Sequence, residues 1–156
     1  MLSIGDKVTG ISLRDQNNSL ISLDDIKSKW VLIYFYPKAL TSGCTVQACA
    51  LRDAEEDLKD LDITVLGVSP DAPALLKKFE DKEGLNFSLL SDEDHSVAEK
   101  FGVWVEKSMY GRTYMGMTRA SFLIDNTGVI RMVWPKVKPA DHLNDILTWV
   151  RTQPSS

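Results

Sequence analysis

The run Trp30 to Tyr36, WVLIYFY, constrains the fold of this chain more than any other stretch. An unbroken series of apolar, β-branched and aromatic residues suits a strand that is buried on both faces of a sheet. Pro37 follows it and predicts the end of strand pairing, because proline has no backbone N–H to give to a neighbouring strand. The chain must therefore build a sheet with structure packed against both of its faces.

The rest of the chain alternates between strand and helix patterns. Apolar spacing and capping residues predict helices at 45–61, 74–83, about 94–101 and about 139–151. Strands are predicted at about 8–13, 20–23, 63–68, 87–90, 121–124 and 129–134, with a turn at 16–19 that makes an N-terminal hairpin. Residues 102–118, which contain Gly and Met, are interpreted as a long and partly extended connection. This order favours one α/β domain with a parallel or mixed sheet.

Composition narrows the function classes. The 156 residues carry 18 Lys and Arg against 22 Asp and Glu, a formal net charge of −4, which argues against a nucleic-acid-binding surface. The sequence has no apolar run of the roughly 18 residues that a membrane span needs. Its first residues, MLSIGDKVTG, lack the features of a secretory signal. We therefore expect a cytoplasmic protein.

The two cysteines, Cys44 and Cys49, leave three interpretations open in a reducing compartment: redox catalysis, metal binding or inert burial. Metal binding is the weakest, because His95 and His142 lie far from the cysteines without ligand-like spacing. Cys49 taken alone, between two alanines, is as compatible with a small buried residue as with a reactive one.

Cys44 is predicted to lie in the first turn of the helix that follows the buried strand. Thr41, Ser42 and Gly43 supply the cap and turn chemistry that begins a helix. The partial positive charge and unpaired N–H groups of a helix N-terminus favour a thiolate, which is the nucleophilic form of cysteine. Arg119 is a candidate for additional positive charge, since the strand after it could lie beside the Trp30–Tyr36 strand.

Five residues separate the two cysteines, and this spacing has a mechanical consequence. On an intact helix their Cα atoms would be ~8.6 Å apart, from a rise of about 1.5 Å and a turn of about 100° per residue. A disulfide needs Cα atoms within ~7 Å of each other. If Cys44 and Cys49 form a disulfide, the first turns of the helix must unwind.

The run Pro37 to Cys44, PKALTSGC, matches the peroxiredoxin pattern P-x-x-x-T-x-x-C. The wider run YFYPKALTSGCTVQACALRD resembles the bacterioferritin comigratory protein, or peroxiredoxin Q, branch of that family. Further similarity occurs at 85–104 and 118–130. The resemblance implies a single thioredoxin-like domain over residues 1–156, with a mixed central sheet, helices on both faces and an N-terminal hairpin.

The resemblance also implies roles for five residues. Cys44 would be the peroxidatic cysteine and form a sulfenic acid, and Cys49 the resolving cysteine that forms an intramolecular disulfide with it. Thr41 would orient the peroxide, Arg119 would stabilise the thiolate and the leaving oxygen, and Pro37 would shield the pocket from water. A thioredoxin-like or other dithiol would then reduce the disulfide, and no cofactor is implied.

The resemblance implies a thiol-dependent peroxidase for hydrogen peroxide and organic hydroperoxides, acting as a monomer or weak homodimer. Ser42 departs from the pattern, since many members have proline there, and serine loosens the turn. Two other function classes stay open. A thioredoxin-like disulfide oxidoreductase would have its cysteines one helical turn apart, whereas a redox-sensing binding module would use the thiol only as a switch.

Overall fold

The structure is a computed structural model and describes residues 1–154. Its strands are β1 (Ser12–Asp15), β2 (Leu20–Ser22), β3 (Trp30–Phe35), β4 (Ile63–Ser69), β5 (Ser88–Ser91), β6 (Trp104–Met109), β7 (Arg112–Met117), β8 (Ala120–Asp125) and β9 (Ile130–Trp134). Its helices are α1 (Ser42–Asp53), α2 (Glu55–Asp60), α3 (Pro73–Glu83), α4 (Ser96–Phe101) and α5 (His142–Arg151), with a short 3-10 helix η1 (Leu23–Asp25).

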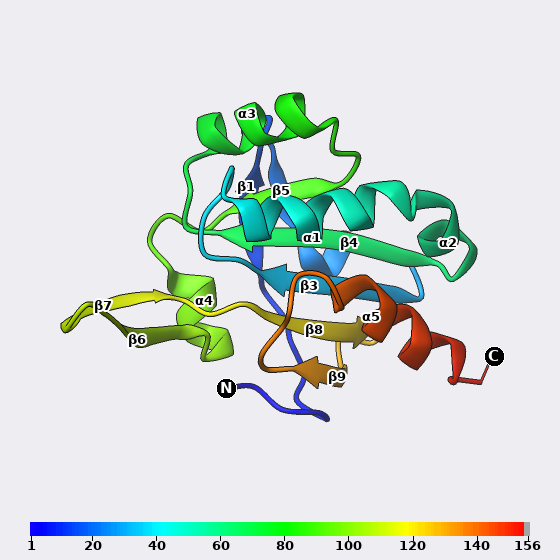
Figure 1. The fold of residues 1–156 in the computed structure, drawn as a ribbon. Helices are drawn as coiled ribbons and strands as arrows, with labels where there is room; N and C mark the ends of the chain where they lie inside the picture. The colour runs from blue at the N-terminus through cyan, green and yellow to red at the C-terminus, as the bar shows by residue number, and fades with distance from the viewer. Residues whose placement is uncertain (155–156) are drawn as a thin grey trace.

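Strand β3 lies inside a mixed sheet whose strand order is β2-β1-β5-β4-β3-β8-β9 (Figure 1). It pairs in parallel with β4 and antiparallel with β8. Every residue of β3 is buried, as the apolar run predicted. Because β3 and β4 are parallel, their C-terminal ends lie at the same end of the sheet. The chain that leaves β3 at this end leads into α1.

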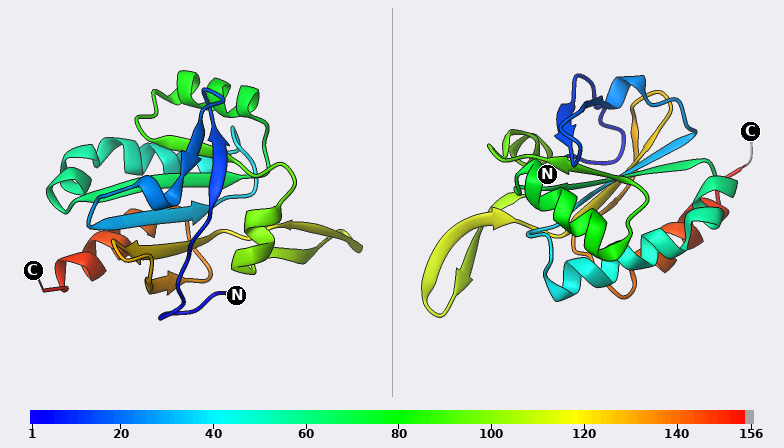
Figure 2. Two further views of the ribbon diagram at one scale, coloured as in Figure 1. Left: turned by 180° about the vertical axis from the view of Figure 1, so that it is seen from behind. Right: turned by 90° about the horizontal axis from the view of Figure 1, so that it is seen from above.

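Helices and loops cover both faces of this sheet (Figure 2). Alternate residues of β3 divide between two apolar clusters: Trp30, Leu32 and Tyr34 pack with α1, α2, α3 and α5, whereas Val31, Ile33 and Phe35 pack with α4 and the N-terminal segment. The predicted mixed sheet, helices on both faces and N-terminal hairpin of β1 and β2 are all confirmed. None of the helices in residues 1–154 has the length and apolar character that crossing a membrane requires.

The single helix predicted for 45–61 is wrong, because the structure divides it into α1 and α2 at Ala54. Ala54 has φ −94° and ψ 17°, and its N–H is shared between the carbonyls of Ala50 and Leu51, which marks a tightened last turn. The apolar residues Leu51, Ala54 and Leu58 keep their spacing of three and four through the break. The spacing of apolar residues therefore does not predict the interruption of the helix at Ala54.

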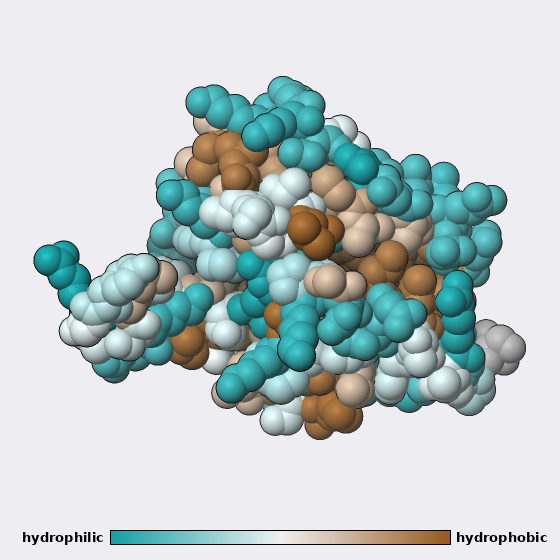
Figure 3. Space-filling model, in the orientation of Figure 1, coloured by the Kyte–Doolittle hydropathy of each residue, from teal (hydrophilic) through white to brown (hydrophobic). Residues whose placement is uncertain are grey.

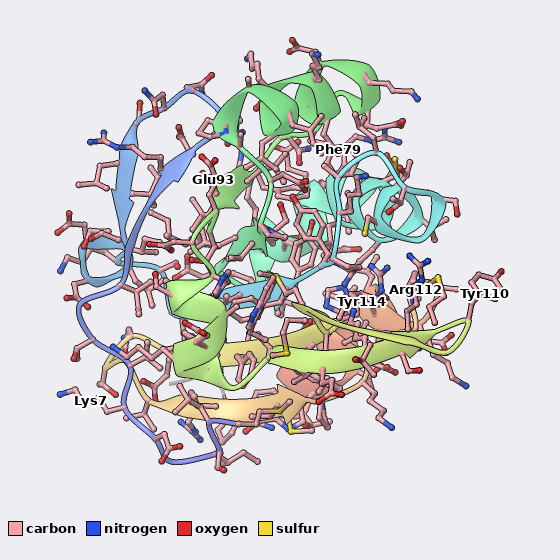
Figure 4. The ribbon with its side chains drawn as sticks, turned by 90° about the vertical axis from the view of Figure 1, so that its left-hand side faces the viewer. Lys7, Phe79, Glu93, Tyr110, Arg112 and Tyr114 are labelled. Carbon is pink, nitrogen blue, oxygen red and sulfur yellow. The ribbon has the colours of Figure 1, made fainter. Side chains whose placement is uncertain are left out.

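The prediction for residues 102–118, a long and partly extended connection, is only partly right, because most of this segment is extended as two paired strands. Strands β6 and β7 form an antiparallel hairpin that projects from the body of the molecule, as a ribbon in Figure 1 and as an arm in Figure 3. Tyr110 and Gly111 form its turn with φ of 52° and 76°, and Tyr110 at the tip is 99% exposed (Figure 4). Because both faces of most of the hairpin meet solvent, its residues do not alternate in polarity.

Candidate active site

The loop between β3 and α1 is held to the end of the neighbouring strand by Asp71. The backbone N–H of Ala39 donates to Asp71 Oδ2 at 2.7 Å, and the Ser69 hydroxyl donates to the same oxygen at 2.8 Å. Ser69 is the last residue of β4, so one carboxylate joins the loop to the sheet edge. Pro37 lies half-buried at the beginning of this loop.

Thr41 is the N-cap of α1, yet its side chain does not cap the helix. Its hydroxyl donates to the carbonyl of Lys38 at 2.8 Å, while its own carbonyl accepts from both the N–H and the hydroxyl of Thr45. The side chain is exposed to solvent. Because its proton is already engaged, the Thr41 hydroxyl has lone pairs left to accept a hydrogen bond from a bound molecule.

Cys44 is the third residue of α1 and is only 1% exposed. The first N–H groups of an α-helix have no intrahelical partner, so this sulfur lies where backbone donors and the positive end of the helix dipole favour an anion. Arg119 Nη2 donates to Cys44 Sγ at 3.4 Å. The sheet explains this contact: Arg119 directly precedes β8, whose first residue Ala120 pairs with Phe35 at the end of β3.

Gly43 makes room for that guanidinium. A Cβ at this position would lie 3.1 Å from Arg119 Nη2 and 3.5 Å from Cγ of Pro139. The glycine is helical and has no positive φ, so its role is to permit a close approach rather than an unusual turn.

Three buried polar residues that sequence reasoning did not identify continue the network behind Arg119. Arg119 Nη1 donates to Gln47 Oε1 at 2.7 Å, and Gln47 Nε2 lies 3.0 Å from His142 Nδ1. His142 Nε2 in turn lies 2.6 Å from Ser121 Oγ. Gln47 is three residues after Cys44 on α1, a spacing that could have indicated a shared helix face. His142 and Ser121 come from α5 and β8, and no local pattern points to them.

Burial and the nearby charge of Arg119 lower the pKa of His142 to about 3, so the imidazole is neutral at ordinary pH. Unfolding returns the side chain to water, where its pKa is about 6.5. The unfolded chain then binds more protons between these two values, so stability falls as the pH falls from about 6.5 towards about 3.

We expect this histidine to contribute a slope of up to about 1.4 kcal/mol per pH unit to the free energy of unfolding in that range. Urea denaturation at a series of pH values measures it. The slope should shrink in His142→Asn relative to the wild type, and an unchanged slope in this variant would contradict the neutral, buried assignment.

The β6–β7 hairpin brings a further cation to the site. Lys107 Nζ donates to the carbonyl of Met117, two residues before Arg119, and its side chain is partly buried. Burial lowers the pKa of Lys107, and the charge of Arg119 lowers it further. Sequence reasoning missed Lys107 because it treated this segment as a connection.

Cys49 faces a different neighbour from Cys44. Its Sγ donates to Glu83 Oε2 on α3 at 3.4 Å, and burial together with this hydrogen bond raises the pKa of the Cys49 thiol. Both cysteines are free, and α1 runs without interruption from Ser42 to Asp53. The structure therefore brings Cys44 and Arg119 together but keeps Cys49 on another side of the helix.

Within residues 1–154, no group of three or more His, Cys, Asp and Glu side chains is placed to hold a metal ion. The guanidinium of Arg119 donates to the Cys44 sulfur through one nitrogen and to Gln47 Oε1 through another. This arrangement stabilises a thiolate and the negative charge that develops on an oxygen next to it.

Comparison with known proteins finds a family model and relatives with similar sequences. Residues 4–133 match the model of the AhpC/TSA family. The chain is 52% identical to a putative peroxiredoxin bcp of Haemophilus influenzae over 97% of both chains, and 51% identical to peroxiredoxin Bcp of Escherichia coli over 96% of both.

Solved structures of the same kind of protein are also similar to this chain. A PrxQ structure from Xylella fastidiosa is similar with a TM-score of 0.91 and 30% identity, over 97% of this chain and 96% of that one. The bacterioferritin comigratory protein of Xanthomonas campestris, described by its alkyl peroxide reduction activity, is similar with a TM-score of 0.86 and 30% identity, over 94% of this chain and 98% of that one.

Proposed function

Because the chain belongs to the AhpC/TSA family, in its Bcp or peroxiredoxin Q branch, and is a thiol-dependent peroxidase, we propose that Cys44 is the thiol that attacks the peroxide. The observation that carries this assignment is the contact of 3.4 Å between Arg119 Nη2 and Cys44 Sγ in the first turn of α1. The Cys49 sulfur instead donates to the carboxylate of Glu83, and the nearby Arg52 donates to Asp53 and to the Glu83 carbonyl rather than to the sulfur.

In the proposed reaction, the Cys44 thiolate attacks one oxygen of a hydroperoxide. The S–O bond forms as the O–O bond breaks, so the sulfur is oxidised by two electrons to a sulfenic acid. The leaving oxygen departs as an alkoxide or hydroxide and takes up a proton from solvent. Arg119 stabilises the charge on that oxygen, Thr41 accepts a hydrogen bond from the peroxide, and Pro37 shields the thiolate from water.

We propose hydrogen peroxide and organic hydroperoxides as the substrates. The similar Xanthomonas campestris protein is described by its alkyl peroxide reduction activity, which supports the organic class. The exposed Thr41 and the solvent-facing loop around it leave space for a substituent on the second peroxide oxygen. A single domain over residues 1–156 carries the activity, as a monomer or weak homodimer in the cytoplasm and without a nucleic-acid partner.

Cys49 closes the cycle in this proposal. Its sulfur bonds to the sulfenic sulfur of Cys44, and the sulfenic hydroxyl leaves as water with the proton of the Cys49 thiol. A thioredoxin-like dithiol then reduces the resulting disulfide and becomes oxidised itself. Since an intact α1 keeps the two Cα atoms ~8.6 Å apart, its first turns must unwind, which separates Cys49 from Glu83.

A matched pair of assays tests this function. The wild type should consume alkyl hydroperoxide repeatedly with a thioredoxin-like dithiol, whereas Cys49→Ser should complete its first oxidation at the wild-type rate and then turn over at least about 10-fold more slowly, because resolution is lost. Mass spectrometry should find the unresolved sulfenic acid on Cys44 advancing to a sulfinic acid with excess peroxide.

Wild-type protein that leaves alkyl and hydrogen peroxide unconsumed would contradict the proposed function. An internal disulfide in Cys49→Ser is impossible, so turnover at the full wild-type rate by this variant with the same dithiol would remove Cys49 from the proposed cycle. Glu83→Gln can be compared with Cys49→Ser in the same assays, because it replaces the carboxylate that accepts from Cys49 while leaving both thiols in place.

A further inference from the structure

We propose that His142 is a positioning residue for peroxide reduction: a neutral imidazole protonated on Nε2, it orients the Gln47 amide so that the amide oxygen holds Arg119 against Cys44. This inference rests on the proposed function. It adds a residue that does not itself contact the peroxide, as Cys44, Thr41 and Arg119 are proposed to do. Its evidence is a chain of hydrogen bonds from Arg119 through Gln47 and His142 to Ser121.

The direction of each hydrogen bond follows from the chemistry of the one before it. A guanidinium only donates, so the Gln47 atom at 2.7 Å from Arg119 must be the amide oxygen. The other amide atom is then NH2, a donor, and the His142 Nδ1 that faces it at 3.0 Å must accept. A neutral imidazole without a proton on Nδ1 carries it on Nε2, which donates to the Ser121 hydroxyl at 2.6 Å.

The opposite arrangement would disturb Arg119. A proton on Nδ1 of His142 would place two donors 3.0 Å apart, and the Gln47 amide would have to rotate to relieve the conflict. Rotation would present its NH2 group to the guanidinium of Arg119, where again two donors would meet. Arg119 would then lose the partner that fixes its Nη1 while its Nη2 contacts Cys44.

Because the network is buried, water cannot replace a hydrogen-bond partner that one of its residues loses. Gln47 and Ser121 are 0% exposed and His142 is 2% exposed. The titratable groups that face His142 are Arg119, whose positive charge opposes protonation of the ring, and Tyr34 of β3, whose ring centroid lies 5.4 Å away. His142 is also the first residue of α5, where the helix dipole disfavours a cation.

The network joins α1 to α5 and β8, and unwinding of α1 would separate Gln47 from the other two elements. Gln47 comes from α1, one turn after Cys44, whereas His142 comes from α5 and Ser121 from β8. Arg119 is therefore positioned by Gln47 only while α1 is folded. In this proposal His142 acts on the peroxide step, for which α1 is intact, and not on the reduction of a Cys44–Cys49 disulfide, in which the contact between His142 and Gln47 is lost.

Two substitutions of His142 separate positioning from general packing. The side-chain oxygen of His142→Asn can occupy the place of Nδ1 and accept from Gln47, whereas the longer side chain of His142→Gln carries its polar atoms at the Nε2 end. Stopped-flow measurement of the peroxide step should show a rate roughly 10- to 100-fold lower for His142→Gln. His142→Asn should remain within about threefold of the wild type.

The reduction of the oxidised protein by a dithiol, measured in the same samples, should be equal in all variants, which a general loss of structure would not allow. His95→Gln is the matched control, because His95 stacks on Trp104 outside the network. A folded His142→Gln with the wild-type rate of peroxide reduction would overturn the inference, whereas a wild type inert toward peroxide would overturn the proposed function.

Nitrogen NMR of the wild type tests the same inference without any variant. We expect His142 to be the Nε2-protonated neutral tautomer, with no change between neutral pH and about pH 5, since burial and Arg119 hold its pKa at about 3. A ring protonated on Nδ1 in this range would overturn the proposal even if His142→Gln failed to fold.

Discussion

Serine in place of Cys44 is expected to abolish peroxide reduction, lowering its rate by more than about 1,000-fold. The physical reason is that the attacking group must be ionised and must accept an oxygen atom. A serine hydroxyl stays protonated at neutral pH even beside Arg119, and its oxygen cannot form the equivalent of a sulfenic acid. The remaining contacts of the site bind a peroxide without any group to reduce it.

The measurement is the consumption of hydroperoxide by Cys44→Ser with excess dithiol, beside wild type and Cys49→Ser. Cys44 is buried in an apolar cluster with Ala48 and Leu51, so circular dichroism should first show that the variant is folded. Full activity in a folded Cys44→Ser would show that the peroxidatic thiol lies elsewhere. Activity in Cys49→Ser with none in Cys44→Ser would assign the first step to Cys44.

Removal of the Arg119 guanidinium is expected to lower the rate of the peroxide step by about 10²- to 10³-fold, the usual cost of losing one donor to a developing oxyanion. In Arg119→Met the side chain keeps much of its length. The positive charge that contacts Cys44 Sγ and the donor to Gln47 Oε1 are both lost. Gln47 and His142 would then be buried beside an uncharged thioether.

Arg119→Lys separates charge from geometry. A lysine ammonium is a point charge, whereas the planar guanidinium donates to Cys44 and to Gln47 from two different nitrogens. We expect Arg119→Lys to recover about 10-fold of the activity lost in Arg119→Met but not the wild-type rate. Arg131→Lys, on the partly exposed strand β9, is the control and should behave as the wild type. Equal rates for Arg119→Met and wild type would remove Arg119 from the mechanism.

The position of the site is predictable from the sequence because its main determinants are local. An apolar run makes a buried strand, Pro37 ends it, and Thr41 to Gly43 begin a helix, so the residue order alone assigns Cys44 to a helix N-terminus. The pairing of β8 with β3 could be proposed from the strand pattern at 121–124, and that pairing is what brings Arg119 to Cys44.

The features that could not be predicted depend on tertiary contacts. His142 and Ser121 meet Gln47 only because α5 and β8 pack beside α1, and neither residue has a local signature. The hairpin of β6 and β7 lacks alternation because most of it is exposed on both faces. The break at Ala54 leaves the apolar spacing intact and is visible only in the backbone.

The same helix therefore has two opposed tasks. Folded, α1 places Cys44 at its N-terminus and Gln47 against Arg119, which favours attack on the peroxide. Folded, it also holds Cys49 on Glu83 and keeps the two sulfurs apart. In the proposed cycle, the Cys44–Cys49 disulfide can form only if the part of α1 that contains both cysteines unwinds after the sulfenic acid has formed.

Hydrogen exchange tests this central claim most directly, by comparing the reduced protein with the protein oxidised by one equivalent of peroxide. We predict that peptides from the first turns of α1 lose their protection in the oxidised protein, while β3 and β4 keep theirs and mass spectrometry finds Cys44 joined to Cys49. A Cys44–Cys49 disulfide with α1 as protected as in the reduced protein would contradict the account.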